Sequence, residues 1–219
     1  MAAAPELLWT GAPGTGPVVA LAHGVGAPMD SPFMNRFAEG LWDEGIPVVR
    51  FEFAYMRRRR TEGARSGPDP APRLLEEWRT VIAGLDAQGI SRRALVIGGK
   101  SMGGRMASMV ADGEGVLALV CLGYPFHPPG KPQVTRVDHL ASLQTPALFV
   151  QGTRDSLGSK EDVAGYRLPR RIRIHWCEDG DHSLKPRKAS GRTEQQNLGE
   201  AIAATADFIR QAAATPRSL

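Results

Sequence analysis

The residues with the clearest chemical potential stand close together in the stretch "VIGGKSMGGRMASMV", which runs from Val96 to Val110. Its segment Gly98–Ser101 resembles the end of a phosphate-binding loop, in which backbone N–H groups and a lysine hold phosphates. The overlapping segment Gly99–Gly103 reads G-x-S-x-G, the turn that exposes a serine nucleophile. The stretch therefore indicates either nucleotide binding or the cleavage of acyl bonds.

The residues before Gly99 argue against the phosphate-binding loop. Such a loop needs a glycine five positions earlier, and that position is Ala94 here. The intervening residues, Leu95–Gly98, are mostly strand formers rather than loop residues. A strand that continues to Gly98 leaves no room for a loop that could wrap around phosphates.

The residues on both sides of Ser101 fit the nucleophile turn. Apolar β-type residues lead into it, and a helical pattern leads out. Gly99 and Gly103 are the small residues that a sharp strand-to-helix turn requires. The start of a helix beneath the serine would also favour developing negative charge. The simpler alternative is a glycine-rich turn in which Ser101 is only the N-cap of the helix.

A serine nucleophile needs a base, and the base needs an orienting acid. After a nucleophile turn of this kind, the order along the chain is serine, acid, histidine. Asp155 follows an apolar run in "LFVQGTRDSLG", and His182 follows the last expected strand in "RIHWCEDGDHSL". The order and the positions predict a triad of Ser101, Asp155 and His182. A helix-capping Asp155 and an exposed loop His182 are the structural alternatives.

Other acids and histidines compete for these roles. Asp179 and Asp181 are neighbours of the histidine in sequence, but neighbours in a tight loop rarely orient one another, so we prefer Asp155. His139 and His175 are expected to be structural, since His175 falls inside a strand pattern.

An oxyanion formed at Ser101 needs two backbone N–H donors. We expect one from Met102, the residue after the serine, and one from Val25 in the early loop "AHGVGAPMDSP". His23 is then expected to brace that loop rather than to act as an acid or base.

The elements that must position these residues alternate between short apolar runs and longer helical patterns. This alternation predicts one α/β domain over residues 1–219, with a mostly parallel sheet and helices on both faces. In such a sheet the functional loops gather at the carboxyl ends of the strands. A basic, Pro/Gly-rich loop is expected at residues 56–72. We predict strands at residues 17–23, 46–53, 94–99, 115–123, 145–152 and 171–178, and helices at residues 32–44, 73–88, 102–112, 161–168 and 194–213.

The composition argues against several other classes of function. The 219 residues carry a formal net charge of +4 with a pI of about 9.4, and much of the excess lies in Arg57–Arg60. A nucleic-acid binder more often spreads its basic residues among aromatics, so we expect no nucleic-acid partner.

Neither Cys121 nor Cys177 has metal-ligand spacing, so no metal is expected. With no secretory signal and no apolar run near the roughly 20 residues that span a bilayer, we expect a cytoplasmic protein without a membrane partner.

Five motifs together resemble the α/β-hydrolase superfamily, and more narrowly its small, nearly lidless branch related to dienelactone hydrolases. They are "HGVGAPMDSPFM", "GGKSMGGRMAS", "GYPFHPP", "QGTRDSLG" and "HWCEDGDHSLKP". The resemblance implies the α/β-hydrolase fold, the Ser101–Asp155–His182 triad and no cofactor, but it implies no substrate. The branch that the chain resembles includes predicted bacterial hydrolases, testis-expressed protein thirty and the third subunit of the NSL chromatin complex. Some eukaryotic members of it serve as assembly subunits. Dienelactone hydrolases carry a cysteine nucleophile, so Ser101 argues against their lactone-ring chemistry.

These observations favour a serine hydrolase that acts on small acyl esters or thioesters. Only a short segment separates the strand ending near Gly123 from the strand that begins near Ala147, which leaves no room for a lid and predicts an open site. His127, in "GYPFHPPG", and Arg57, which opens the arginine run, are the candidates for substrate binding. A catalytically silent scaffold protein and a small serine peptidase are the alternatives, and the oligomeric state is open.

Overall fold

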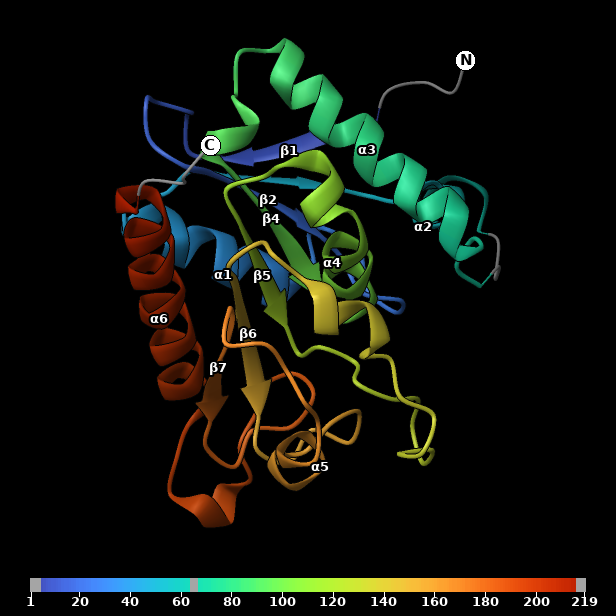
Figure 1. Cartoon of the computed structure of the whole chain (residues 1–219), viewed down its shortest axis with the longest axis vertical. Coiled ribbons are helices and arrows are strands. Elements are labelled where there is room, and N and C mark those ends of the chain that lie inside the picture. The colour runs from blue at the N-terminus through green and yellow to red at the C-terminus, as the bar shows by residue number, and fades with distance from the viewer. Residues whose placement is uncertain (1–4, 64–66, 216–219) are drawn as a thin grey trace.

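The computed structural model describes residues 5–63 and 67–215, which form a seven-stranded sheet flanked by helices (Figure 1). The strands are β1 (Leu7–Thr10), β2 (Val18–Ala22), β3 (Val48–Phe51), β4 (Leu95–Lys100), β5 (Ala118–Leu122), β6 (Ala147–Gly152) and β7 (Ile172–Cys177). The helices are α1 (Pro32–Asp43), α2 (Ala54–Glu62), α3 (Ala71–Ala87), α4 (Met102–Glu114), α5 (Lys160–Ala164) and α6 (Glu194–Ala214). Short 3-10 turns lie at Arg92–Ala94, Asp138–Ser142 and Lys188–Ser190.

The strands follow the order β1-β3-β2-β4-β5-β6-β7, and all neighbours from β3 to β7 are parallel. Crossover connections, most of which contain an α-helix, join the parallel strands, and this arrangement confirms the predicted α/β-hydrolase fold class. The edge strand β1 pairs antiparallel with β3 and was not predicted. It has only four residues, all of them partly exposed, so its sequence carries little of the apolar signal that marks a buried strand.

Two apolar layers cover the two faces of the sheet. Side chains in β2 alternate between them: Val18 and Ala20 face the layer that contains α3 and α4, whereas Val19 and Leu21 face the layer that contains α1 and α6. Burial on both faces explains why the parallel strands read as nearly continuous apolar runs. In Figure 1, α6 lies on one side of the sheet, and α3 and α4 pack together on the other.

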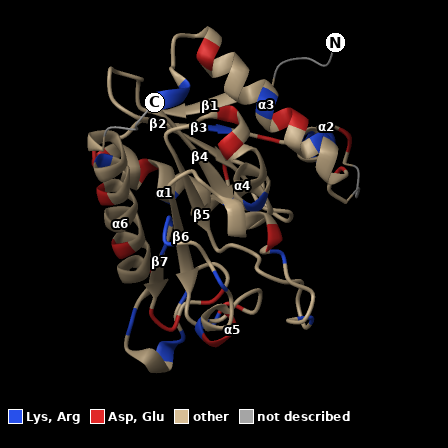
Figure 2. Cartoon of the chain, viewed as in Figure 1, with Lys and Arg blue, Asp and Glu red and all other residues tan. Residues whose placement is uncertain are grey.

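The predicted loop at residues 56–72 is wrong in its first half, because residues 54–62 form helix α2. Arginine is a good helix former, and this propensity outweighs the repulsion within the run. Acidic residues on neighbouring segments also offset the charge: Arg58 lies 2.7 Å from Asp69, and Arg60 lies 2.7 Å from Asp30. Figure 2 shows this mixture of basic and acidic residues around α2. Gly63 ends the helix with φ 64°.

The carboxyl ends of β2, β4, β6 and β7 meet at one edge of the sheet, as parallel pairing requires. The loops after these strands carry most of the residues singled out from the sequence. Residues 123–146, all of them described, connect β5 to β6 and contain only the short 3-10 turn Asp138–Ser142, so no lid covers this edge. Among the described residues, none of the helices has the length and apolar character to cross a membrane.

Candidate active site

Ser101 occupies a strained turn between β4 and α4. Its backbone has φ 52° and ψ −115°, a region that residues with a side chain rarely adopt. The Ser101 N–H donates to Leu122 O at 2.9 Å, which ties the turn to the neighbouring strand. A Cβ atom at Gly99 would lie 2.1 Å from Ala22 O, and one at Gly103 would lie 2.5 Å from the same atom. The glycines of the G-x-S-x-G pattern are therefore needed for close backbone contact with β2.

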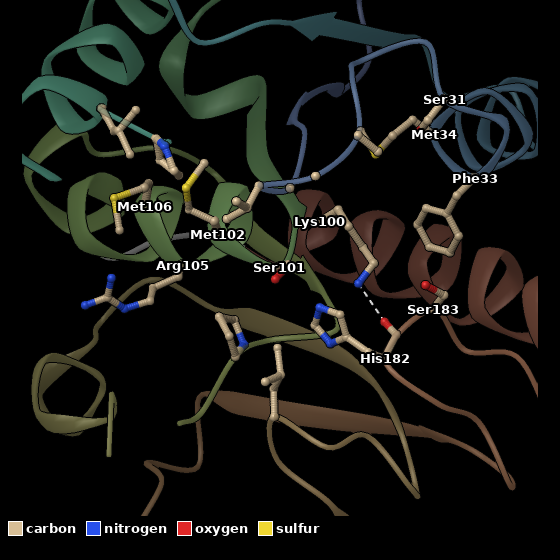
Figure 3. Close-up of a pocket in the computed structure, with 18 of the residues that line it drawn as sticks. Ser31, Phe33, Met34, Lys100, Ser101, Met102, Arg105, Met106, His182 and Ser183 are labelled. Carbon is tan, nitrogen blue, oxygen red and sulfur yellow. Dashed lines mark hydrogen bonds between the residues drawn. The ribbon is translucent and has the colours of Figure 1, made fainter. Parts of the chain in front are cut away.

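His182 and Asp155 are joined by a hydrogen bond of 2.8 Å between Nδ1 and Oδ2. The carboxylate of Asp155 has no exposed surface. Its Oδ1 accepts a second hydrogen bond from the Leu157 N–H at 2.8 Å, so the buried charge is well satisfied. A carboxylate on Nδ1 favours the tautomer whose proton sits there, which leaves Nε2 free to accept a proton. Ser101 and His182 border the same cavity, and both are drawn in Figure 3.

Gln151 is a buried support for this pair that sequence reasoning missed. Its Nε2 donates to Asp155 Oδ2 at 2.8 Å and to Gly158 O at 3.0 Å. Its Oε1 accepts from the Tyr124 N–H at 2.7 Å. The available signal was a single amide in the otherwise apolar β6, because a polar group buried in a strand must find hydrogen-bond partners.

The histidine loop, residues 178–187, contains Asp179 and Asp181, the two alternatives to Asp155 as the acid that orients His182. Both carboxylates make other contacts within the loop and its surroundings. Asp179 is paired with Arg187 and Arg154, and Arg187 holds the pKa of this carboxyl at about 2. Asp181 Oδ1 accepts the backbone N–H of Ser183 at 2.8 Å and that of Lys185 at 3.0 Å, which shapes the turn around His182.

Two residues outside the predicted set fasten this loop to the rest of the molecule. The buried Asn197 of α6 donates to Glu178 O at 3.0 Å and to Leu184 O at 2.8 Å. Lys100, directly before Ser101, donates from Nζ to His182 O at 2.6 Å, the dashed bond in Figure 3. Burial lowers the pKa of the Lys100 amine to about 8.

The loop after β2 lies against the turn of Ser101. A Cβ atom at Gly24 would lie 3.6 Å from Ser101 Cβ. The fully buried ring of His23 accepts the Phe53 N–H at 3.1 Å through Nε2, and the Tyr55 hydroxyl donates to Gly24 O at 3.1 Å. These bonds brace the loop, and burial lowers the pKa of His23 to about 4, so the ring is neutral.

The two predicted oxyanion donors border the same cavity as Ser101. Val25 lies on the braced loop, and Met102 begins α4, so its N–H has no partner within the helix. The Val25 N–H has no acceptor among the described residues, whereas its carbonyl accepts from Tyr55 at 3.3 Å. Neither amide N–H therefore has a protein acceptor among the described residues, as an oxyanion donor requires.

The cavity at this edge has a volume of about 690 Å³ and is bordered by Ser101 and His182. The two residues predicted to bind substrate do not line it. His127 is buried, with Nδ1 2.9 Å from Pro128 O and Nε2 3.4 Å from Asp162. Arg57 donates to Glu52 O at 2.6 Å. The cationic side chains that do line the cavity are Lys100, Arg105 and Arg136.

A family model described as the alpha/beta hydrolase domain matches residues 15–210 of the chain. The chain belongs to the alpha/beta hydrolase family. This result confirms the family that the five sequence motifs resemble, and it makes the protein a member of a family of hydrolases.

Solved structures of other alpha/beta hydrolases have the same fold. A serine hydrolase without a lid from Xanthomonas campestris is 19% identical with a TM-score of 0.68, and the match covers 97% of this chain and 91% of that one. Est1E from Butyrivibrio proteoclasticus, solved with bound ferulic acid, is 15% identical with a TM-score of 0.67 and 96% coverage of both chains. The dienelactone hydrolase from Anabaena variabilis is 16% identical with a TM-score of 0.66, covering 95% of this chain and 99% of that one. At these identities the likeness establishes the shared fold of the small, lidless branch.

Proposed function

We propose that this alpha/beta hydrolase is a serine hydrolase that cleaves small acyl esters or thioesters. Ser101 is the nucleophile, His182 is the general base and acid, and Asp155 orients the imidazole. The observation that carries this proposal is the 2.8 Å bond from His182 to the buried Asp155, with Ser101 on a strained turn beside the same cavity. Three residues far apart in sequence meet at one edge of the sheet, in the chain order that a nucleophile turn requires.

The reaction proceeds in two acyl-transfer steps. His182 Nε2 takes the hydroxyl proton as Ser101 Oγ attacks the carbonyl carbon, and the resulting imidazolium is stabilised by Asp155. The backbone N–H groups of Val25 and Met102 donate to the oxyanion. The tetrahedral intermediate collapses when the carbon–oxygen or carbon–sulfur bond breaks and His182 gives its proton to the leaving group. A water molecule then attacks the acyl-enzyme by the same route and releases the acid and free Ser101.

The shape of the cavity supports small acyl groups. Long lipids are held in covered apolar tunnels, whereas this cavity opens to solvent and has no lid above it. Its walls are mainly apolar, with Met34, Leu74 and Met106 among them. A short acyl chain can pack on these side chains while its carbonyl lies at Ser101.

Labelling with a fluorophosphonate probe tests the proposal. We expect the wild-type protein to be labelled and to hydrolyse p-nitrophenyl acetate and a short acyl thioester. Ser101→Ala is expected to lose the label and to lower kcat by a factor of at least about 10³, because the nucleophile itself is removed. Ser183→Ala is the matched control, since Ser183 lines the same cavity without a partner in the triad.

Two outcomes would contradict the proposal. Equal labelling of the wild type and Ser101→Ala would show that the probe reacts elsewhere. A wild-type protein that neither binds the probe nor turns over any ester, thioester or amide would instead favour a non-catalytic scaffold with the hydrolase fold.

A further inference from the structure

The described residues that line the cavity beside Ser101 include more cationic side chains than carboxylates. Within the described part of the chain, the cationic side chains that border it are Lys100, Arg105 and Arg136, and the lining carboxylate is that of Asp69. Asp69 already has a cationic partner outside the cavity, because its Oδ1 lies 2.7 Å from Arg58. Among the described lining residues, cationic side chains therefore outnumber carboxylates.

Arg105 and Arg136 differ from Arg58 and Arg60 of α2, which pair with carboxylates. Neither forms an ion pair within the described part of the chain, whereas Arg58 and Arg60 of α2 each have a carboxylate partner. The Nε of Arg105 is buried and has no hydrogen-bond partner among the described residues. The terminal nitrogens of the Arg105 and Arg136 guanidinium groups have no hydrogen-bond partner within the described residues either, and a charged donor is stabilised when an acceptor binds it.

The two guanidinium groups also lie close enough to affect each other. Burial and the positive charge of Arg105 together lower the pKa of Arg136. The backbone fixes both residues, since Arg136 N–H donates to Phe126 O at 2.7 Å and Arg105 N–H donates to Ser101 O at 3.0 Å. An anion placed between them would relieve the repulsion and would fit the planar, bidentate geometry of a guanidinium.

The position of Arg105 relates this charge to the reacting serine. It stands one turn after Ser101 on α4, and Figure 3 shows both residues at the same end of that helix. Four residues of helix rise about 6 Å, a distance that a few methylene groups span. The apolar side chains of Met102 and Met106 lie along the same wall. The cavity thus combines a nucleophile, an apolar wall and a cationic end.

We propose that Arg105 and Arg136 form a carboxylate subsite, so that the substrates are short acyl esters or thioesters whose acyl group ends in a second carboxylate. Half-esters of short dicarboxylic acids, such as glutaric acid, are the simplest substrates of this kind. This inference rests on the proposed serine hydrolase function, and it assigns to Arg105 and Arg136 the role that the sequence suggested for Arg57.

The test compares two esters of equal acyl length, mono-p-nitrophenyl glutarate, which carries a free carboxylate, and p-nitrophenyl pentanoate, which is neutral. We expect the wild type to have the higher kcat/KM for glutarate, with the preference shrinking as ionic strength rises. Arg105→Gln and Arg136→Gln should each lower the glutarate-to-pentanoate ratio by at least about tenfold, mainly through KM, because a charge-assisted bond is lost. Arg105→Lys should fall between the wild type and Arg105→Gln, since it keeps the charge without the planar fork.

Arg57→Gln is the matched control, because it removes an arginine from the same side of the sheet without touching the cavity, and it should leave the ratio unchanged. The carboxylate subsite would be rejected if the wild type showed no preference for the glutarate ester, or if the variants lowered kcat/KM for both esters equally. Neither result would contradict the proposed serine hydrolase function. Glutarate binding to Ser101→Ala, measured by calorimetry, separates the two proposals. Binding that Arg105→Gln abolishes supports the subsite even if no ester is cleaved, and absence of binding rejects it.

Discussion

At the scale of single residues, the proposed mechanism depends on the hydrogen bond between His182 Nδ1 and Asp155 Oδ2, which would orient the imidazole. Asp155→Asn would replace the carboxylate by an amide, which favours the wrong imidazole tautomer and no longer stabilises the imidazolium. We expect kcat for ester hydrolysis to fall on the order of 10⁴-fold with little change in KM. Steady-state kinetics on p-nitrophenyl acetate would measure this effect.

Asp181→Asn is the control for that experiment. Asp181 neighbours His182 in sequence, but its Oδ1 accepts backbone N–H groups, and an asparagine oxygen retains those bonds. We expect near wild-type kinetics. If Asp181→Asn lost as much activity as Asp155→Asn, the assignment of the orienting acid to Asp155 would be wrong.

The sequence alone identified some residues of the candidate site and missed others. The pattern around Ser101 and the positions of Asp155 and His182 after strands were visible in the sequence, because the backbone geometry of the fold dictates where such residues must stand. Gln151 and Arg105 were not singled out, since their importance depends on which groups lie near them in space. Arg57 does not line the cavity, because charge in a sequence does not reveal which groups a side chain contacts in the folded chain.

At the scale of elements, the junction of β4 and α4 sets the position of Ser101. A Cβ atom at Gly103 would lie 2.5 Å from Ala22 O and 2.6 Å from His23 O, and neither backbone atom can move without shifting β2 and the loop after it. We therefore expect Gly103→Ala to lower the free energy of unfolding by at least about 2 kcal/mol. Displacing the turn by a fraction of an ångström should also lower kcat by roughly 10²-fold.

Gly113, on the same helix, provides the matched comparison. It is exposed, and a Cβ atom there would meet nothing within 4 Å. Gly113→Ala should stabilise the protein by about 0.5–1 kcal/mol through the higher helix propensity of alanine. Urea denaturation of both variants would give the two free energies, and a destabilisation of similar size in both would contradict the role of the tight junction.

The helices and strands differ in how accurately the sequence predicts them. The parallel strands and the helices α1, α3, α4 and α6 were predicted to within a few residues, because burial imposes a strong apolar period on them. β1 and α2 were missed, since each is short and depends on its neighbours. α2 in particular is stabilised by carboxylates such as Asp69 and Asp30, which lie elsewhere in the chain.

At the scale of the whole molecule, the buried, neutral His23 makes the free energy of unfolding depend on pH. Its pKa is lowered from 6.5 to about 4 by burial, and the positive charges of Arg59 and Arg60 add to that shift. Between these two values the unfolded chain binds a proton that the folded protein does not. The free energy of unfolding should therefore fall as the pH is lowered from 6.5 to 4, by about 3 kcal/mol in total for this one group.

His23→Gln removes this titration while keeping an oxygen that can accept the Phe53 N–H bond now made to the ring. We expect the variant to be less stable than the wild type at pH 7, where the packing of the imidazole against Phe53 and Tyr55 is lost. As the pH falls toward 4, the wild type should lose stability more steeply, so that the two curves of unfolding free energy approach each other. Urea titrations across this range would measure both curves. Parallel curves would mean that His23 is protonated equally in the folded and unfolded chains, and that the acid sensitivity of the fold originates at other groups.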